Sequence, residues 1–517
     1  MVNTNLFQSN PRALPPPVNA LNEAGGTAYA FTPRHALAQY AATGCLNGTF
    51  YASAEVQLDR LLALSGQVPP DFVARTALYC RERGYMKDTP ALLCAVLSVL
   101  GPELLPRVFP RVIDNGRMLR TFVQIMRSGV VARRSLGSLP KRLVREWLDS
   151  RGEDALLRDA VGQTPSLADI VRMVHPKPKT PQREAFYGYL LGRAYAKEAL
   201  PERVAAYEAF KADPSRPVPD VPFQLLTGLP LDTRAWTQIA RNASWQMTRM
   251  NLNTFLRHGV FEEPGLEKRV AKRLADPDEV RRARVFPYQL LAAWQAAGRN
   301  LPERLREALR DAMEVSIENV PRVDGRVYVC LDVSGSMQSP VTGVREGATS
   351  AVRCVDVAAL MAAAVLRRNP DSEVVPFEHQ VVPLALRARD TVLSNAQRLA
   401  SVGGGGTSCS APLAWLNARK VKGDLVVFVS DNESWVDARA GRGTETMREW
   451  EVFRRRNPGA RLVCIDLQPY GTTQAQERED ILNVGGFSDA VFEVMADFAR
   501  GQLSAPRWVD AIERVEL

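Results

Sequence analysis

The stretch Val327–Met337, with the sequence VYVCLDVSGSM, decides how the second half of the chain folds. It begins with an apolar run rich in β-branched residues, which predicts a buried strand. The run ends in Asp-x-Ser-x-Ser, so a carboxylate and two hydroxyls follow one another at intervals of two residues. Oxygen ligands at this spacing can converge on one small hard cation. The alternative is that Ser334 and Ser336 only cap the next helix.

Strand-like and helix-like segments alternate after this stretch. The expected strands are Tyr328–Leu331, Glu373–Phe377, Leu425–Val429 and Leu462–Leu467, and the expected helices are Cys354–Arg368, Asp390–Ser401, Thr407–Arg419, Thr444–Arg456 and Asp489–Phe498. This alternation predicts a doubly wound, mostly parallel α/β sheet. Ligands of such sheets bind beyond the carboxyl ends of the strands, and Asp332 lies at such an end.

Two later segments supply further oxygen ligands. The glycine run Gly403–Gly406 lets the backbone approach a ligand closely and leads into Thr407. A second apolar strand ends at Asp431. We therefore expect a cation site made of Asp332, Ser334, Ser336, Thr407 and Asp431. Its oxygen-only shell favours Mg²⁺, with Ca²⁺ or Mn²⁺ as alternatives, over zinc or copper.

The first half of the chain has a helical pattern after an irregular, proline-bearing lead-in at residues 1–27. Apolar residues recur at intervals of three and four, and the linkers are short. Expected helices include Pro33–Thr43, Ser53–Leu64, Pro70–Arg83, Thr89–Leu100, Ser138–Ser150, Ser166–Met173, Arg183–Phe210, Thr233–His258, Pro277–Ala297 and Pro302–Ile317. Short-linked helix pairs suggest a helical repeat, although no exact internal repeat is visible.

Composition places the chain among soluble globular proteins. It has 517 residues, 46% of them hydrophobic and 24% charged. No apolar run is long enough to span a membrane, and residues 1–21 lack the apolar region of a signal peptide. The seven cysteines contain no Cys-x-x-Cys pair, which favours reduced cysteines over disulfides or a zinc ribbon. We expect a cytoplasmic protein with no membrane partner.

Positive charge is concentrated in the first half. Residues 1–325 carry 44 Lys and Arg against 33 Asp and Glu, whereas residues 326–517 carry 22 against 24. A basic excess of this kind indicates a polyanionic partner, and the alternative is a solvated basic surface without a partner. Candidate contacts to such a partner are Arg117, Arg120, Arg127, Arg133, Arg134, Lys141 and Arg142, and the family resemblance described below implies that the partner is RNA and that His175, Lys177 and Lys179 also face it. His175 can equally be structural.

The five expected cation ligands resemble the metal-ion-dependent adhesion site of von Willebrand factor A domains, with all five positions present in order. A basic helical part followed by an A domain then resembles the Ro ribonucleoprotein family, whose helical part is a TROVE domain. The segments that carry this resemblance are Gly44–Tyr51, Leu139–Trp147, Asp169–Pro178 and Met247–Asn253. Two departures from the family are the displaced Arg249 and the short neutral segment Gly162–Thr164.

The resemblance implies a TROVE domain at residues 28–324 and an A domain at residues 325–517. Ro TROVE domains form a ring of HEAT-like helical repeats. The ring holds single-stranded 3′ ends of misfolded or defective RNA in its central hole and Y RNA on its basic outer surface. Bacterial relatives act with an exoribonuclease in RNA maturation and turnover. In A domains the cation accepts an acidic group from a partner, and the site is not catalytic.

Two other classes of function stay open from the residues alone. An enzyme is disfavoured because Gly403–Thr407 lacks the lysine of a phosphate-binding loop and no histidine adjoins a nucleophile. A protein-interaction scaffold that docks an acidic partner at the cation site is the second alternative, and the uneven basic charge argues against it.

Overall fold

The computed structural model describes residues 15–162, 164–298, 300–318, 320–344, 352–436, 443–501 and 508–517. The chain forms two compact units. The first, here called the α/β unit, comprises residues 1–64, 286–292 and 316–512. The second, here called the helical unit, comprises residues 65–285, 293–315 and 513–517. No helix in the described part of the chain has the length and apolar character needed to cross a membrane.

A five-stranded sheet forms the centre of the α/β unit. Its strand order is β4 (Glu373–Phe377), β3 (Val327–Asp332), β5 (Leu425–Ser430), β6 (Arg461–Asp466) and β8 (Ile481–Gly485), and all neighbours are parallel. The prediction of a doubly wound parallel sheet is thus confirmed. Because all strands run the same way, the ends of β3, β5 and β6 bring Asp332, Ser430 and Asp466 to one edge.

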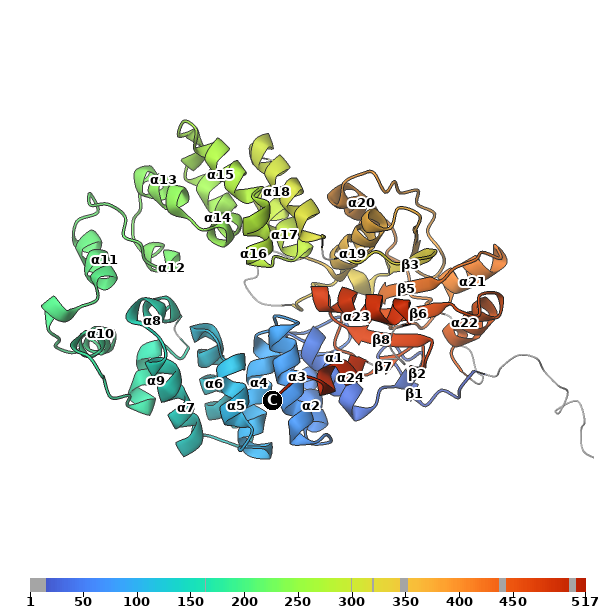
Figure 1. The fold of residues 1–517 in the computed structure, drawn as a ribbon, viewed down its shortest axis with the longest axis horizontal. Coiled ribbons are helices and arrows are strands. Elements are labelled where there is room, and N and C mark those ends of the chain that lie inside the picture. The colour runs from blue at the N-terminus through green and yellow to red at the C-terminus, as the bar shows by residue number, and fades with distance from the viewer. Residues whose placement is uncertain are drawn as a thin grey trace, which may run out of the picture. The chain divides into compact units, whose positions relative to one another are not determined.

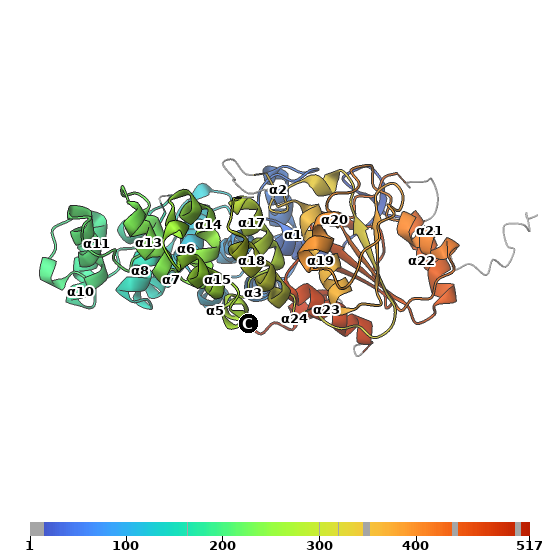
Figure 2. The ribbon, with the colours of Figure 1, turned by 90° about the horizontal axis from the view of Figure 1, so that it is seen from above.

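Helices cover both faces of this sheet. Helix α19 (Cys354–Arg368) packs against β3, β4 and β5, with α20 (Val392–Leu399) behind it, and α23 (Asp489–Arg500) packs against β6 and β8. Helices α21 (Ala411–Ala418) and α22 (Glu445–Arg456) lie on the opposite face (Figure 2). Alternate strand residues such as Tyr328, Cys330 and Phe428 meet Trp450 and Phe453 of α22 in a buried core, as the two-residue period of a strand requires.

The N-terminal segment is part of the α/β unit. Strand β2 (Thr27–Ala30) pairs with β1 (Ala20–Leu21) on one side and with β7 (Thr472–Thr473) on the other, in both cases antiparallel. Tyr29 is buried in the core, and α1 (Pro33–Thr43) packs against β8. The units therefore divide the chain differently from the expected boundaries after residues 27 and 324. Helix α2 (Ala54–Ser65) follows at the end of this segment.

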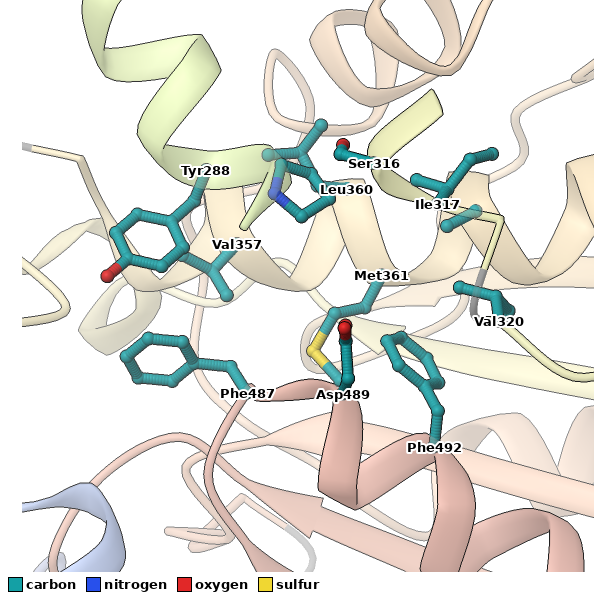
Figure 3. Close-up of a pocket in the computed structure, with 12 residues that line it drawn as sticks. Tyr288, Ser316, Ile317, Val320, Val357, Leu360, Met361, Phe487, Asp489 and Phe492 are labelled. Carbon is teal, nitrogen blue, oxygen red and sulfur yellow. The ribbon is translucent and has the colours of Figure 1, made fainter. Parts of the chain in front are cut away.

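Residues 286–292 and 316–320 also return to the α/β unit. They contribute Tyr288, Ile317 and Val320 to an apolar pocket, which is closed on its other sides by α19 and by Phe487 and Phe492 (Figure 3). Its lining is almost entirely hydrocarbon and aromatic. These contacts explain why two short segments on either side of residues 293–315 belong to this unit.

The helical unit consists of short helices that lie side by side in chain order (Figure 1). They are α3 (Pro70–Glu82), α4 (Asp88–Leu100), α5 (Leu105–Val112), α6 (Gly116–Ser128), α7 (Ser138–Asp149), α8 (Glu153–Asp159), α9 (Leu167–Val174), α10 (Pro181–Leu191), α11 (Glu202–Ala212), α12 (Phe223–Leu226), α13 (Thr233–Asn242), α14 (Trp245–Arg257), α15 (Leu266–Leu274) and α16 (Pro277–Ala283), with parts of α17 (Pro287–Ala297) and α18 (Glu303–Ser316). The predicted helical repeat architecture is confirmed.

Three expected long helices are each broken. The break in Arg183–Phe210 comes at Gly192, which ends α10 in the left-handed conformation. The break in Thr233–His258 comes at Ala243, which is extended, and Ser244 then caps α14. The break in Pro277–Ala297 comes at Arg284, which adopts a φ of 45° and ends α16. Apolar periodicity continues across all three points, so it does not reveal a change of backbone direction.

Candidate metal centre and basic helical surface

The Asp-x-Ser-x-Ser turn holds the Asp332 carboxylate in a fixed orientation. Asp332 is the last residue of β3 and is fully buried. Its Oδ1 accepts a hydrogen bond from the backbone N–H of Ser334 at 2.8 Å, and its Oδ2 accepts one from Ser430 Oγ at 2.6 Å. The hydroxyls of Ser334 and Ser336 are 3.3 Å apart. Neither serine caps a helix, because the short helix that follows, Ser336–Gln338, has Gly335 as its N-cap residue and no side-chain cap.

The glycine loop is tied directly to this turn. Gly404 N–H donates to the carbonyl of Val333 and Gly335 N–H donates to the carbonyl of Gly405, both at 2.8 Å. Gly403 has a φ of +84°, and a Cβ there would overlap Val333, so glycine is required for this close approach. Thr407 follows in the same loop with its side chain buried. The prediction that a helix begins at Thr407 was wrong, because α21 begins only at Ala411.

Asp431 completes the cluster from the next strand. It comes directly after β5 and is buried, and its Oδ1 accepts a hydrogen bond from the backbone N–H of Glu433 at 3.3 Å. Hydrogen bonds therefore link Asp332, Ser334 and Ser336, and Asp431 follows Ser430, whose hydroxyl donates to Asp332. Thr407 is buried in the glycine loop that is bonded to the same turn.

Four buried carboxyl groups gather at this end of the sheet: Asp332, Asp431, Glu433 and Asp466. Burial raises the pKa of each one, and the charge of Asp431 adds to the effect on its three neighbours. The pKa of Asp332 rises to about 7 and that of Glu433 to about 9. In the described part of the chain, none of the four forms an ion pair with Lys, Arg or His, and Glu433 Oε1 has no hydrogen-bond partner.

This donor set fits a hard divalent cation. Uncompensated buried carboxylates are costly, and a bound cation would supply the missing positive charge. The described residues contain no group of three or more His, Cys, Asp and Glu side chains that could hold a metal by themselves. A cation here would need the hydroxyls of Ser334, Ser336 and Thr407 as well as the two aspartates, and such a shell suits Mg²⁺ rather than zinc.

Sequence reasoning missed Glu433 and Asp466. Asp466 ends β6 as Asp332 ends β3, so the same strand-end signal could have found it. Its carboxylate accepts hydrogen bonds from Asn432, which has a φ of 61°, and from Gln39 of α1. The contact with Gln39 crosses more than 400 residues of sequence and has no local signal.

The candidate RNA-binding residues lie on helices α6 and α7, in the segment between them and after the end of α9, and α9 packs against both other helices. Three of the ten form ion pairs with acidic neighbours: Arg117 with Asp88, Arg142 with Glu146, and Lys179 with Asp149. Two direct their guanidinium groups at carbonyl oxygens, Arg120 at Asp159 and Arg133 at Ser98.

The other five candidates are Arg127, Arg134, Lys141, His175 and Lys177, here called the unpaired basic set. They have no acidic partner among the described residues, and all except the half-buried Lys141 are exposed. His175 ends α9 with a φ of 50°, which places it in the turn that leads to Lys177. The structure thus leaves half of the candidates available to an anionic ligand.

Comparisons with known proteins agree with both parts of the molecule. The Ro60 vWA domain model matches residues 326–499, and the TROVE domain model matches residues 232–326. The RNA-binding protein RO60 of Deinococcus radiodurans is 28% identical over 538 residues, which cover 93% of this chain and 95% of that protein. The chain is therefore similar to a Ro-type protein along almost its whole length. The crystal structure of the D. radiodurans RO (RSR) protein has a TM-score of 0.62 and 25% identity, and covers 91% of this chain and 100% of that one.

A second Ro-family relative, the RNA-binding protein RO60 of Caenorhabditis elegans, is 25% identical over 280 residues, or 51% of this chain and 41% of that protein. The match to the TROVE model begins after the basic stretch on α6 and α7. The similarity to Ro proteins therefore rests on the A domain, the end of the TROVE domain and the alignment along almost the whole chain.

Proposed function

We propose that this protein is of the Ro type and binds RNA through the basic side chains of α6 and α7, of the segment between them and of the turn after α9. The unpaired basic set carries the proposal, because exposed cations without an internal partner are the groups that attract phosphate. Contacts of this kind recognise structured RNA by shape and charge with little sequence preference. Support comes from the two RO60 relatives, both of which are named RNA-binding proteins.

The finer proposal follows the family resemblance. The basic surface binds Y RNA, and a ring of helical repeats receives single-stranded 3′ ends of misfolded or defective RNA in its hole. The protein then acts in cytoplasmic RNA quality control together with an exoribonuclease and has no catalytic residues of its own. Purified protein with Mg²⁺ should leave a labelled RNA intact over hours, and cleavage that co-purifies with the protein would refute this.

RNA affinity measured at several salt concentrations tests the basic surface. A variant with Arg127→Glu, Lys141→Glu and Lys177→Glu should bind a small structured RNA more weakly. The slope of log K against log salt should become shallower by roughly 2 to 3, because three phosphate contacts are lost. The matched control is Lys211→Glu, Arg216→Glu and Arg282→Glu, which changes the net charge equally at exposed residues that are paired with acids. Equal effects of the two variants would refute the basic-surface proposal.

The second part of the proposal is that Asp332, Ser334, Ser336, Thr407 and Asp431 hold a divalent cation, Mg²⁺ first. The buried, uncompensated carboxyl cluster supports it. Calorimetric titration of the full chain with Mg²⁺ or Mn²⁺ should detect one site that Asp332→Asn abolishes. RNA affinity should be spared in this variant, and its loss in a folded protein would contradict the separation of the two functions. The protein-scaffold alternative rests on this same site, which would then dock an acidic partner.

A further inference from the structure

The helical unit contains a pocket of about 340 Å³ where α13 and α14 meet. Its walls come from the segment 218–221, from α12, from the second half of α13 and from the first turn of α14. Most of the lining side chains are aliphatic, as Ile239 and Met247 are, and Gln238 and Asn242 add two amides. Small-molecule sites have this composition, because apolar walls supply contact area and a few polar groups select the ligand. The volume is near the lower end for such sites, so the pocket suits one small molecule.

Hydrogen bonds within the helical unit hold the walls of this pocket in place. The backbone N–H of Val218 donates to Gln238 Oε1 at 3.2 Å, which ties the segment before α12 to α13. The Arg273 guanidinium donates to the carbonyl of Ala240 at 2.9 Å, which fixes the end of α13. The helix break at Ala243, which also lines the pocket, then turns the chain into α14. The pocket is therefore formed before a ligand binds, and binding requires little further ordering of the chain.

The two amides of the pocket lie on the same face of α13, because Gln238 and Asn242 are four residues apart. The oxygen of Gln238 accepts the hydrogen bond from Val218, so its NH₂ group is left to donate to a ligand. Asn242 is exposed, so its amide can offer a ligand one acceptor and two donors. The pocket thus presents a donor on Gln238 beside a donor and an acceptor on Asn242.

The charge of the pocket disfavours an anionic ligand. Asp220 is the one charged side chain among the described residues that line it, and its carboxylate is paired with Arg203 at 2.8 Å. An anion would therefore lose hydration without gaining a lining cation. A neutral, flat molecule with donors and acceptors on its edge fits the lining better.

Adenine has the edge that these two amides require. Its N7 accepts and its N6 amino group donates, and an Asn amide pairs with this pattern through two hydrogen bonds. Its other ring nitrogens accept, so one of them can take a hydrogen bond from the NH₂ group of Gln238. Guanine has acceptors at both N7 and O6, so the carbonyl of Asn242 would face another acceptor.

We propose that this pocket binds the adenine ring of a nucleoside. Free adenosine is one source of the ring, and an unpaired adenosine within an RNA is the other. Only the second source rests on the RNA binding proposed above. The pocket recognises the base, whereas the basic surface on α6 and α7 attracts phosphate.

Calorimetric titration of the full chain with adenosine tests the proposal. Wild-type protein should bind guanosine at least about 5-fold more weakly than adenosine, and a 5′-phosphate on adenosine should add no affinity. Asn242→Ala and Asn242→Asp should each weaken adenosine binding at least about 5-fold, since the first removes the amide and the second sets an acceptor against N7. The matched control is Gln224→Ala, which removes an exposed amide of α12 that does not line the pocket. It should bind adenosine as wild type does.

A competition experiment identifies the source of the ring. Saturating oligoadenylate should abolish adenosine binding if RNA supplies the ring, whereas oligouridylate should leave it unchanged. If neither oligonucleotide competes, the pocket takes free adenosine alone.

Three results would overturn the proposal: no binding at about 1 mM adenosine, unchanged affinity in both Asn242 variants, or an affinity that the 5′-phosphate raises about 10-fold. The last result would mark an anion site. None of them would refute RNA binding by the basic surface, because that binding is tested with structured RNA through its salt slope.

Discussion

Replacing Asp332 by asparagine should stabilise the cation-free protein at alkaline pH and destroy its response to Mg²⁺. Asp332 is fully buried next to Asp431, with no basic partner among the described residues. Asparagine has the same shape but cannot ionise. The substitution therefore separates the free-energy cost of burying the charged carboxylate from the contribution of its packing.

The magnitude follows from the raised pKa. The folded-state pKa of Asp332 is about 7, against an ordinary value of 3.8, so ionising it in the cation-free folded protein costs roughly 4 kcal/mol. Because the folded pKa is the higher one, the stabilisation that the protonated carboxyl provides is complete below about pH 4. It is lost progressively as the pH rises through 7. Asparagine retains one acceptor oxygen for the two donors, Ser334 N–H and Ser430 Oγ, so roughly 1 to 2 kcal/mol of hydrogen bonding is lost.

The net gain for the variant is roughly 2 kcal/mol at pH 8 in EDTA, which corresponds to about 5 °C in melting temperature for a unit of this size. At pH 4.5 the gain should vanish or reverse, since wild-type Asp332 is then protonated. Mg²⁺ at pH 8 should raise the melting temperature of wild type but not of the variant, because only a cation that binds the folded protein stabilises it. A variant that is less stable than wild type at pH 8 in EDTA would refute the reasoning, as would a wild-type response to Mg²⁺ that Asp332→Asn preserves.

Three further predictions concern the helical unit, each measured as the free energy of unfolding in urea. Arg183→Met should cost roughly 3 kcal/mol, because the buried guanidinium bonds Glu153 and the carbonyls of Leu148 and Arg151; a cost below 1 kcal/mol would show that these bonds are dispensable. Phe122→Ala should cost about 4 kcal/mol, since its buried ring packs edge to face on Phe109 at 5.0 Å; a neutral effect would exclude a tightly packed core there. Ser166→Ala should lower the free energy of unfolding by about 1 kcal/mol, because it removes the capping box with Asp169 at the start of α9. Ser166→Thr should retain most of this stability, because threonine can also cap the helix.

The sequence was sufficient for the elements that local patterns specify. The apolar run before Asp332 is strand β3, and the alternation after it is the observed parallel sheet. The sequence also located the helices α1 and α2, but it did not show that residues 15–64 belong to the α/β unit, because the pairing of β2 with β7 joins segments more than 400 residues apart. Periodicity describes which face of a segment is apolar and does not say which distant segment covers that face. For the same reason, periodicity did not reveal the helix breaks at Ala243 and Arg284.

In the candidate cation site, too, local sequence patterns revealed some residues and not others. Spacing and strand ends pointed to its five expected ligands because these come from three loops at one sheet edge. Glu433 was visible in the sequence two residues after Asp431, but only its burial without a charged partner marks it as unusual.

Composition alone overstates the number of phosphate contacts, because some of the basic residues are already paired with acidic neighbours. The nine Lys and Arg candidates would give a salt slope of roughly −8, whereas the four Lys and Arg residues of the unpaired basic set support about −3.6. The three paired candidates would have to exchange an acidic neighbour for phosphate. Reversing Arg127, Arg134 and Lys177 should therefore reduce the slope more than reversing Arg117, Arg142 and Lys179, although both variants change the net charge by the same amount. Equal reductions would mean that RNA opens these ion pairs freely, as weak surface pairs allow, and that the internal pairing does not select the contacts.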